Sequence, residues 1–495
     1  MHHRAGKTKI QTILKRVFGL TALRPGQQAV IDAVLAKQHT LAIMPTGAGK
    51  SLCYQIPALL MPGMTVVVSP LIALMRDQFD KLSALGLEAV QVNSAVDSSV
   101  IRRAHMKIGR RSVEFVFTTP EQLASGELRE RLAHATVDLV VIDEAHCISQ
   151  WGHDFRPAYL EAVAAVHAHR EATILALTAT ATPDVVEDIA RQLGVGPLRV
   201  INTGVHRPNL SYRVVPVTND ADKLRHLAGM IRAVPGSAIV YAATVRHVEE
   251  LAQWCRQEGI EAVSYHGRMR ADERTDAQAR FMSGQAPVII ATNAFGMGID
   301  KPDIRAVVHY DLPASLDVYY QESGRAGRDG EPAECTLLFQ RSDRQLQTFF
   351  MAGRYPTHDD FTILIDGLRS FEDGPPRSVH DIHTAVPTLG RGKLRVMLTV
   401  LKQEGFLRER RGARFEVLPR LFRESVEPLA QHYEQRRQKD RAKLEQIVIY
   451  GQTALCRTRL LLEALGERVD WSQCGTCDNC RAVSIRSEGV ASGAA

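Results

Sequence analysis

The run Pro45-Thr46-Gly47-Ala48-Gly49-Lys50-Ser51 follows the apolar stretch 41–44 and precedes a helical stretch. Glycines let backbone N–H groups turn inward toward an anion. We expect Thr46, Gly47 and Gly49 to form a cradle for phosphates, Lys50 to reach the β- and γ-phosphates, and Ser51 to bind Mg²⁺. An ordinary turn would not need a strand before it and a helix after it. The run therefore predicts a nucleoside triphosphate site of the Walker A type.

Two carboxylates, Asp143 and Glu144, follow the buried-strand pattern 139–142. In a parallel sheet, residues at the carboxyl ends of strands face the ligand. We expect Asp143 to hold Mg²⁺ and Glu144 to orient or deprotonate the attacking water. The alternative is a solvated acidic loop, which the Walker A run upstream disfavours.

A third polar group lies in the run 321–328, Gln-Glu-Ser-Gly-Arg-Ala-Gly-Arg. Arg325 and Arg328 are three residues apart and could share a helix face toward the γ-phosphate, as arginine fingers supplied by the same chain. We expect Gln321 to be one of the residues that bind the nucleotide. The alternative for the two arginines is a solvated basic face.

Four of the eight cysteines lie within 25 residues of one another near the end of the chain: Cys456, Cys474, Cys477 and Cys480. Four thiolates are enough for one closed tetrahedral zinc site, with Cys456 expected on a helix. A closed ligand set indicates a structural role for the zinc ion. The other four cysteines are expected to be packed residues.

The elements that must position these groups form two series of short apolar strands with helices between them. We expect strands over 65–69, 115–119, 139–142 and 174–177, and then over 238–241, 288–291, 306–309 and 336–339. This alternation predicts two parallel α/β domains that meet near residue 205, joined by the extended connector 204–209.

The strand rhythm stops after residue 341, where helical periodicity begins. Short helices at 361–371, 379–385 and 393–403, followed by a hairpin, predict a winged helix. Arg391, Lys393 and Arg395 head its recognition helix and are candidates for DNA phosphate contacts, with a solvated basic face as the alternative. The expected segments are 1–205, 206–341, 342–375 (helical start of the zinc module), 376–420 (winged helix), 421–482 (zinc module) and 483–495 (flexible tail).

The composition, 45% hydrophobic and 23% charged, is that of a globular protein of several domains and not of a disordered or fibrous one. Residues 341–495 hold 25 basic and 20 acidic side chains, so most of the net charge of +6 lies where a polyanion would be contacted. No apolar run reaches the length of a membrane span, and no signal peptide is evident at the start. We expect a cytoplasmic protein that does not bind membranes.

In this order the motifs resemble those of a superfamily-two helicase, and the details resemble the RecQ family of DNA helicases. Leu23-Arg24-Pro25-Gly26-Gln27-Gln28 is similar to the adenine-reading motif of that family, which implies that Arg24 and Gln27 contact the base. Segments 69–78, 119–121, 177–181, 265–267 and 291–302 follow further family motifs. The cysteine cluster resembles the family's zinc module.

The segment 147–157, directly after Asp143-Glu144-Ala145-His146, carries the most diagnostic part of the resemblance. Trp151, Phe155 and Arg156 would allow stacked bases of a single strand to be sensed next to the Mg²⁺ ligands. Core packing of the two aromatic side chains is the alternative.

The resemblance implies two RecA-like domains that use ATP, Mg²⁺ and structural Zn²⁺ to move 3′ to 5′ on single-stranded DNA and to unwind duplex DNA. Partly duplex DNA, and unidentified repair or recombination proteins, would be partners. One departure is that the winged-helix segment precedes the zinc cysteines. Three alternatives are a DNA-stimulated translocase or annealing factor, a DNA-binding regulator with a vestigial ATPase, and an RNA helicase. The intact nucleotide motifs disfavour the second alternative, and the zinc module and aromatic-rich loop disfavour the third.

Overall fold

The computed structural model describes residues 2–110, 112–124, 126–149, 156, 158–167, 169, 171–296, 299–410, 414–425 and 427–483. These residues form two compact units. Unit 1 contains residues up to 311, residues 316–338 and the chain from Thr453 onward, whereas unit 2 contains residues 312–315 and 339–452. Each unit has its own hydrophobic core.

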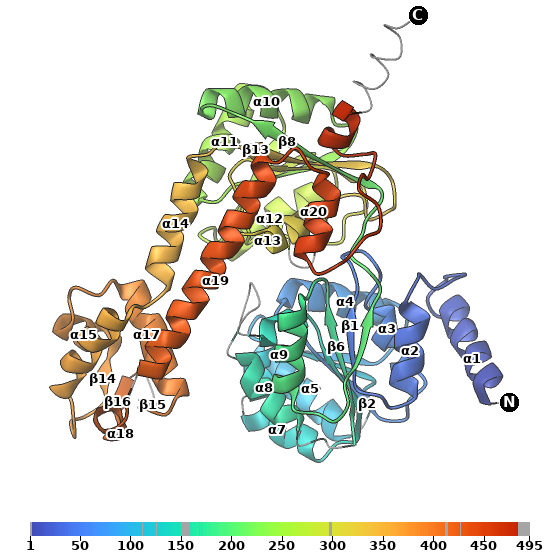
Figure 1. Cartoon of the computed structure of the whole chain (residues 1–495). Helices are drawn as coiled ribbons and strands as arrows, with labels where there is room; N and C mark the ends of the chain where they lie inside the picture. Colours follow the sequence, from blue (N-terminus) through green and yellow to red (C-terminus); the bar gives the residue numbers. More distant parts are fainter. Residues whose placement is uncertain are drawn as a thin grey trace, which may run out of the picture. The chain divides into compact units, whose positions relative to one another are not determined.

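The first sheet of unit 1 has the strand order β3-β4-β2-β5-β6-β1-β7, and neighbouring strands are parallel. Its core consists of apolar side chains such as Val67, Phe117 and Val141. Helices cover both faces, with α2 and α3 on one side and α8 and α9 on the other (Figure 1). The strands are β1 (Thr40–Ile43), β2 (Met64–Val68), β3 (Ala89–Val92), β4 (Phe115–Thr118), β5 (Val137–Ile142), β6 (Thr173–Thr178) and β7 (Arg199–Asn202).

The first domain begins with two helices before β1, and its other helices lie in the crossover connections between parallel strands. The helices are α1 (His2–Arg16), α2 (Gln27–Leu35), α3 (Leu52–Ala58), α4 (Ile72–Ala84), α5 (Ser98–Gly109), α6 (Pro120–Ala124), α7 (Gly126–Ala133), the short 3₁₀ helix η1 (Ala145–Ile148), α8 (Ala158–Val166) and α9 (Pro183–Leu193).

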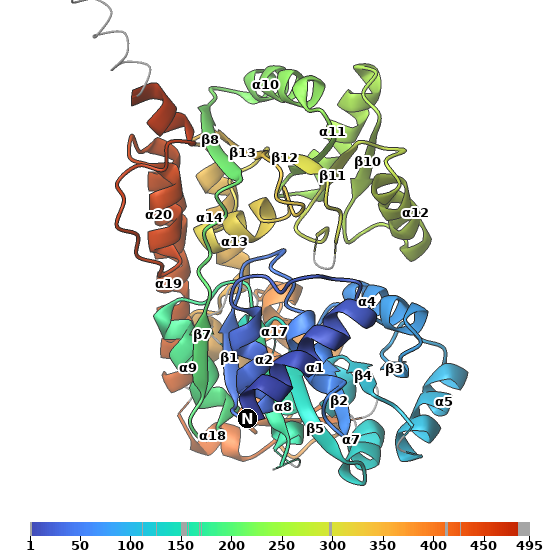
Figure 2. The same cartoon turned by 90° about the vertical axis from the view of Figure 1, so that its right-hand side faces the viewer.

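The second sheet of unit 1 has the order β10-β11-β9-β12-β13-β8. Helix α10 lies on the opposite side of this sheet from α13 (Figure 2). The strands are β8 (Leu210–Pro216), β9 (Ser237–Tyr241), β10 (Ala262–Tyr265), β11 (Val288–Ala291), β12 (Ile304–His309) and β13 (Ala333–Phe339). The helices are α10 (Asp220–Ala233), α11 (Val245–Gln257), α12 (Ala271–Met282), α13 (Leu316–Ser323) and, near the cysteines, α20 (Arg457–Ala464).

The predicted fold class, two RecA-like parallel-sheet domains followed by a mostly helical region, is confirmed by this architecture. The strands predicted from apolar runs are present within three residues of their expected bounds. Four further strands, β3, β7, β8 and β10, were not predicted, and they are the edge strands of the two sheets.

Unit 2 contains a small three-stranded sheet of order β14-β16-β15 packed with three helices. Its elements are α14 (Asp343–Arg354), α15 (His358–Arg369), β14 (Arg377–Ser378), α16 (Val379–Ala385), α17 (Arg391–Gln403), β15 (Leu407–Arg410), β16 (Arg414–Val417), α18 (Arg420–Arg423) and α19 (Glu427–Gln452). This is the helix and strand order of a winged helix.

The core of unit 2 extends beyond the segment 376–420. Phe361, Leu364 and Leu368 of α15 are fully buried against Leu394 of α17, and Ala430 of α19 belongs to the same cluster. A cut at residue 376 would therefore separate α15 from its packing partners. The cysteines and α20 belong to unit 1, whereas α19, which precedes them in the chain, belongs to unit 2.

Candidate nucleotide site and zinc centre

The phosphate-binding loop at 45–51, called the Walker A loop below, connects β1, which pairs with β6 and β7, to α3. Gly47 and Gly49 have φ angles of +83° and +76°, in the left-handed region that favours glycine. A Cβ atom on Gly49 would lie 2.6 Å from the side-chain nitrogen of Gln27. The backbone of this loop therefore depends on both glycines, as the sequence predicted.

Arg24 and Gln27 contact the Walker A loop from the segment before α2. The Gln27 side chain, which is 1% exposed, donates from Nε2 to the carbonyl oxygens of Ala48 at 3.0 Å and Gly49 at 2.8 Å. The Arg24 guanidinium donates to the carbonyl of Gly47, and the Arg24 backbone N–H donates to Gln27 Oε1 at 2.7 Å. Both residues thus support the loop as well as line the cavity next to it.

The carboxylates Asp143 and Glu144 lie at the carboxyl end of β5, as expected. The Ser69 hydroxyl donates to Asp143 Oδ2 at 3.2 Å. Burial, together with the nearby Glu144 carboxylate, raises the pKa of Asp143 from 3.8 to about 6, although Lys50 acts in the opposite direction. Because the charged form of this carboxyl group is poorly solvated, a bound cation would stabilise it strongly.

Glu144 has a positive φ of 50° and directly precedes the 3₁₀ helix η1. Its Oε2 lies 3.3 Å from Nδ1 of the buried His146, and the same nitrogen lies 3.1 Å from Oγ1 of Thr178 at the end of β6. Thr178 donates to the Thr180 carbonyl at 2.9 Å. Hydrogen bonds therefore join His146, which lies close to Glu144, to the motif at 177–181.

Arg325 and Arg328 do not share a helix face, contrary to the sequence-based expectation, because α13 ends at Ser323 and both follow it in a turn. Gly324 and Gly327 break the helix here, and Gly327 has a φ of +55°. We call residues 324–328 the finger loop. Arg325 is 5% exposed and donates to the carbonyl of Gly296. Arg328 Nη1 lies 3.1 Å from Asp300, whose carboxylate also pairs with Lys81 at 3.2 Å.

One cavity of about 480 Å³ in unit 1 collects these groups. It is lined by Arg24, Gln27, Thr46, Gly47, Gly49, Lys50, Ser51, Asp143, Glu144, Gln321, Arg325 and Arg328, among others. Among the described residues, Nε of Arg325 and Nε of Arg328 are buried without a hydrogen-bond partner. Buried cationic donors without acceptors are suited to the oxygens of a phosphate, so the residues present fit ATP and Mg²⁺.

Sequence reasoning did not foresee the ion pairs of Asp300 with Lys81 and Arg328, because nothing in the spacing of residues so far apart indicates their contact. Trp151 and Phe155 lie outside the described residues. Arg156 is described, and its backbone N–H donates to the Cys147 carbonyl at 3.0 Å.

The basic residues predicted on the recognition helix α17 divide into two kinds. Arg391 and Arg395 are exposed. Lys393 is instead 21% exposed, and its Nζ lies 2.8 Å from Asp360, a residue of the capping box that begins α15. The ion pair of Lys393 ties two helices of unit 2 together.

The four predicted zinc ligands, Cys456, Cys474, Cys477 and Cys480, lie together with their ligand atoms within 4.8 Å of one another. Tetrahedral zinc with Zn–S bonds of about 2.3 Å needs sulfur atoms roughly 3.8 Å apart, so the cluster fits the ion. The neighbouring Cys477 thiol and the hydroxyls of Thr458 and Thr476 lower the pKa of Cys474 to about 3, which favours a thiolate. The sequence predicted that Cys456 lies within a helix, but it lies just before the start of α20.

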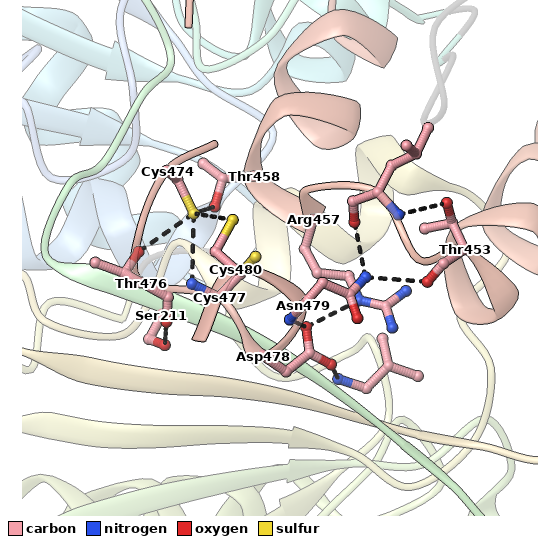
Figure 3. A network of polar contacts seen from close by, with 12 residues as sticks. Ser211, Thr453, Arg457, Thr458, Cys474, Thr476, Cys477, Asp478, Asn479 and Cys480 are labelled. Carbon is pink, nitrogen blue, oxygen red and sulfur yellow. Dashed lines mark hydrogen bonds and ion pairs between the residues drawn. The ribbon is translucent and has the colours of Figure 1, made fainter. Parts of the chain in front are cut away.

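The zinc centre is joined to the edge strand β8 by polar contacts (Figure 3). Asp478 accepts hydrogen bonds from the backbone N–H of Val214 at 2.9 Å and from Nε of Arg457 at 3.1 Å. The Ser211 hydroxyl donates to the Thr476 carbonyl at 2.7 Å. The cysteine cluster thus fixes a loop that satisfies backbone groups at the edge of the second sheet.

Family models match most of the chain. They are DEAD/DEAH box helicase at residues 24–189, helicase conserved C-terminal domain at 222–330 and RecQ zinc-binding at 415–481. The chain is 42% identical over 360 residues to the ATP-dependent DNA helicase RecQ of Bacillus subtilis, covering 71% of this chain and 58% of that protein. It is 37% identical over 380 residues to the probable ATP-dependent DNA helicase RecS of the same organism, covering 76% of each.

The chain therefore belongs to the RecQ family of superfamily-two helicases, and it carries the zinc-binding domain of that family. It spans little more than half the length of the RecQ protein of Bacillus subtilis and of that of Pasteurella multocida, covering 58% and 52% of them.

Two solved structures share the fold at low identity. The Mycobacterium smegmatis helicase Lhr bound to single-stranded DNA aligns with a TM-score of 0.55 at 23% identity, over 82% of this chain and 60% of that one. Dbp5 of Saccharomyces cerevisiae, bound to RNA, aligns with a TM-score of 0.56 at 18% identity, over 70% and 90% of the two chains. Among the described residues, no helix is both long enough and apolar enough to cross a bilayer.

The raised pKa of Asp143 predicts how its removal changes stability. Above pH 6 the folded protein carries a poorly solvated carboxylate, which costs on the order of 1–2 kcal/mol after allowance for partial exposure. Asp143→Asn should raise the thermal midpoint of the nucleotide-free protein at pH 8. The gap to wild type should close as the pH falls from 8 to 5, because wild-type Asp143 takes up a proton. Thermal melts at several pH values measure this gap.

The control for this experiment is Asp80→Asn, which changes an exposed carboxylate on α4 and should leave the midpoint unchanged throughout. A thermal midpoint for Asp143→Asn that stays below that of wild type at pH 8 would contradict the conclusion that Asp143 is a poorly solvated carboxylate with a raised pKa.

The cysteine cluster predicts the metal content of the protein. The protein purified without added zinc should carry close to one zinc ion per chain, and Cys477→Ser should lower both zinc content and thermal stability, because binding of structural zinc contributes folding free energy. Elemental analysis and thermal melts measure the two quantities. As a control, Cys255→Ala removes a buried thiol of the second domain core and should leave the zinc content unchanged. Full stability after complete loss of zinc would contradict the structural role.

Proposed function

We propose that this chain is an ATP-dependent DNA helicase that moves 3′ to 5′ on single-stranded DNA and unwinds duplex DNA during DNA repair or recombination. The observation that carries the proposal is the single cavity in which the Walker A loop, the acidic pair and the finger loop meet. The names of the RecQ relatives support DNA as the substrate. The direction of movement is taken from the family resemblance.

In the proposed reaction, backbone N–H groups of the Walker A loop and Lys50 hold the phosphates of ATP, while Arg24, Gln27 and Gln321 contact the nucleotide. Ser51 and Asp143 would hold Mg²⁺, which neutralises charge on the phosphates. Glu144 orients the attacking water, and its buried Oε2 has no hydrogen-bond partner among the described residues, so it can accept a hydrogen bond from that water. Arg325 and Arg328 stabilise negative charge on the γ-phosphate in the transition state.

The DNA contacts are proposed at two places. Trp151, Phe155 and Arg156 would contact single-stranded DNA next to the acidic pair and so couple its binding to hydrolysis. The exposed Arg391 and Arg395 of α17 would contact duplex phosphates. We leave Lys393 out of this second set because its charge is already paired with Asp360.

An unwinding assay tests the proposal. Wild-type protein with ATP and Mg²⁺ should separate duplexes that carry a single-stranded 3′ tail and should leave duplexes with a 5′ tail paired. Lys50→Ala should lower ATP turnover on the order of a thousandfold and abolish unwinding, because it removes charge that stabilises the γ-phosphate. Turnover within tenfold of wild type would refute the site assignment.

The same assay separates the alternatives. DNA-stimulated hydrolysis without strand separation on any tailed duplex would favour a translocase or annealing factor. Equal unwinding of RNA and DNA duplexes would contradict DNA as the specific substrate.

The winged helix gives a further prediction. The double variant Arg391→Ala/Arg395→Ala should weaken duplex binding and lower the slope of log affinity against log salt concentration by about 2, one unit for each lost phosphate contact. Its DNA-stimulated ATP hydrolysis should persist, because neither residue lines the nucleotide cavity. Equilibrium binding at several salt concentrations measures the slope.

The control is Arg423→Ala/Arg441→Ala, which removes the same charge from exposed positions of unit 2 outside α17. If this control and the α17 variant lower the slope equally, the recognition helix has no special contact with DNA.

A further inference from the structure

The connector between the two sheets of unit 1 is held by side chains from two distant parts of the chain. It runs from the end of β7 at Asn202 to the start of β8 at Leu210. The Tyr320 hydroxyl of α13 donates to the Val205 carbonyl at 2.5 Å, and the Val205 N–H donates to the carboxylate of Glu467, which follows α20. The connector is therefore a fixed segment, although it belongs to no helix or strand.

Arg207 of this connector is the residue with the most informative contacts. Its Nη1 donates to the Thr46 carbonyl of the Walker A loop at 3.0 Å and to the Gly324 carbonyl of the finger loop at 3.1 Å. Its Nη2 donates to two more finger-loop carbonyls, Ala326 at 2.9 Å and Gly327 at 2.7 Å. One guanidinium thus joins the backbones of two loops that both line the nucleotide cavity.

The geometry uses the full donor capacity of an arginine. The remaining N–H group, at Nε, faces Oδ1 of Asn209 at 3.4 Å, so each of the five N–H donors has an acceptor. A lysine has the same charge but three donors on one nitrogen, and it cannot span acceptors on two separate loops. The acceptors are neutral carbonyls, so the contact depends on the planar shape of the guanidinium more than on ion pairing.

The finger loop is built for this close approach. A Cβ atom on Gly324 would lie 3.4 Å from Cβ of Thr46, and one on Gly327 would lie 2.5 Å from Nδ2 of Asn209. The finger-loop carbonyls that Arg207 binds belong to the residues directly before and after Arg325 and directly before Arg328. Any shift of these carbonyls therefore moves the two arginines relative to the Walker A loop.

We infer that Arg207 is a positioning residue that sets the finger loop in register with the Walker A loop. This inference rests on the proposed ATPase function and adds a residue that does not itself line the nucleotide cavity. Because the Arg207 guanidinium binds backbone carbonyls of the two loops and is not among the residues that line the cavity, its loss changes the placement of Arg325 and Arg328, whose charge acts mainly in the transition state. The turnover number should fall, while the affinity for ATP should change little.

The test compares Arg207→Lys and Arg207→Ala with wild type by DNA-stimulated ATP hydrolysis and by equilibrium binding of a fluorescent ATP analogue. We expect both variants to lower kcat by about 10- to 100-fold, since displacement of a catalytic group by about 1 Å has effects of that size, and to keep KM and the analogue Kd within about threefold. Arg213→Lys on β8 is the matched control, because this exposed arginine has one carboxylate partner and should keep wild-type kinetics.

A double-mutant cycle separates positioning from a general loss of stability. If Arg207 acts through the finger loop, Arg207→Lys should lower kcat little further in an Arg325→Ala/Arg328→Ala background, where both of the arginines that it positions are absent. The same fold loss in both backgrounds would overturn the inference, as would wild-type kcat for Arg207→Lys or a parallel loss of analogue affinity. Absence of ATP hydrolysis by the wild-type protein would instead refute the proposed function. The two failures are therefore distinguishable.

Discussion

Charge held away from bulk water is the constraint on which the nucleotide cavity of this chain depends. Asp143 is poorly solvated at the end of β5, which raises its pKa, and Lys50 compensates only part of its charge. On the other side of the cavity, the guanidinium groups of Arg325 and Arg328 keep buried nitrogens without acceptors. Such groups are costly alone and favourable together once a magnesium-bound polyphosphate lies between them. Lys50 and Asp143 come after the ends of β1 and β5, and the two arginines lie in the turn after α13, so these elements bring the charges together.

The sequence foretold the central strands of both sheets and missed the edges, for one physical reason. A strand covered on both faces must be apolar along its length, and runs such as 139–142 reveal it. An edge strand has a free side and a less buried surface. Strand β7 is mostly exposed, and β10 is buried at one position only. The short β3 is buried but contains Gln91. Such patterns resemble loops when the sequence is read alone.

The residues of the candidate site also divide into those that the sequence predicts and those that it does not. Lys50, Asp143 and the four cysteines could be predicted because local sequence patterns identify them. Lys50 lies in a glycine-rich loop after a strand, Asp143 belongs to an acidic pair after a strand, and the cysteines have a repeated spacing. The turn that carries Arg325 and Arg328 depends on two glycines that end α13, and the regular spacing of the arginines concealed that break. The pairing of Lys393 with Asp360, and the five acceptors around Arg207, arise only from the tertiary fold.

The zinc centre then has a definable mechanical role in unit 1. Strand β8 lies at an edge of the second sheet, and an edge strand exposes backbone groups that must find partners. Asp478, next to the ligand Cys477, accepts from the Val214 N–H of that strand, and Glu467 accepts from Val205 in the connector just before it. A loop with few apolar residues can hold such carboxylates in place only if something other than a hydrophobic core fixes it. Four thiolates around one ion supply that rigidity, so metal binding and the position of the connector are parts of one structural arrangement.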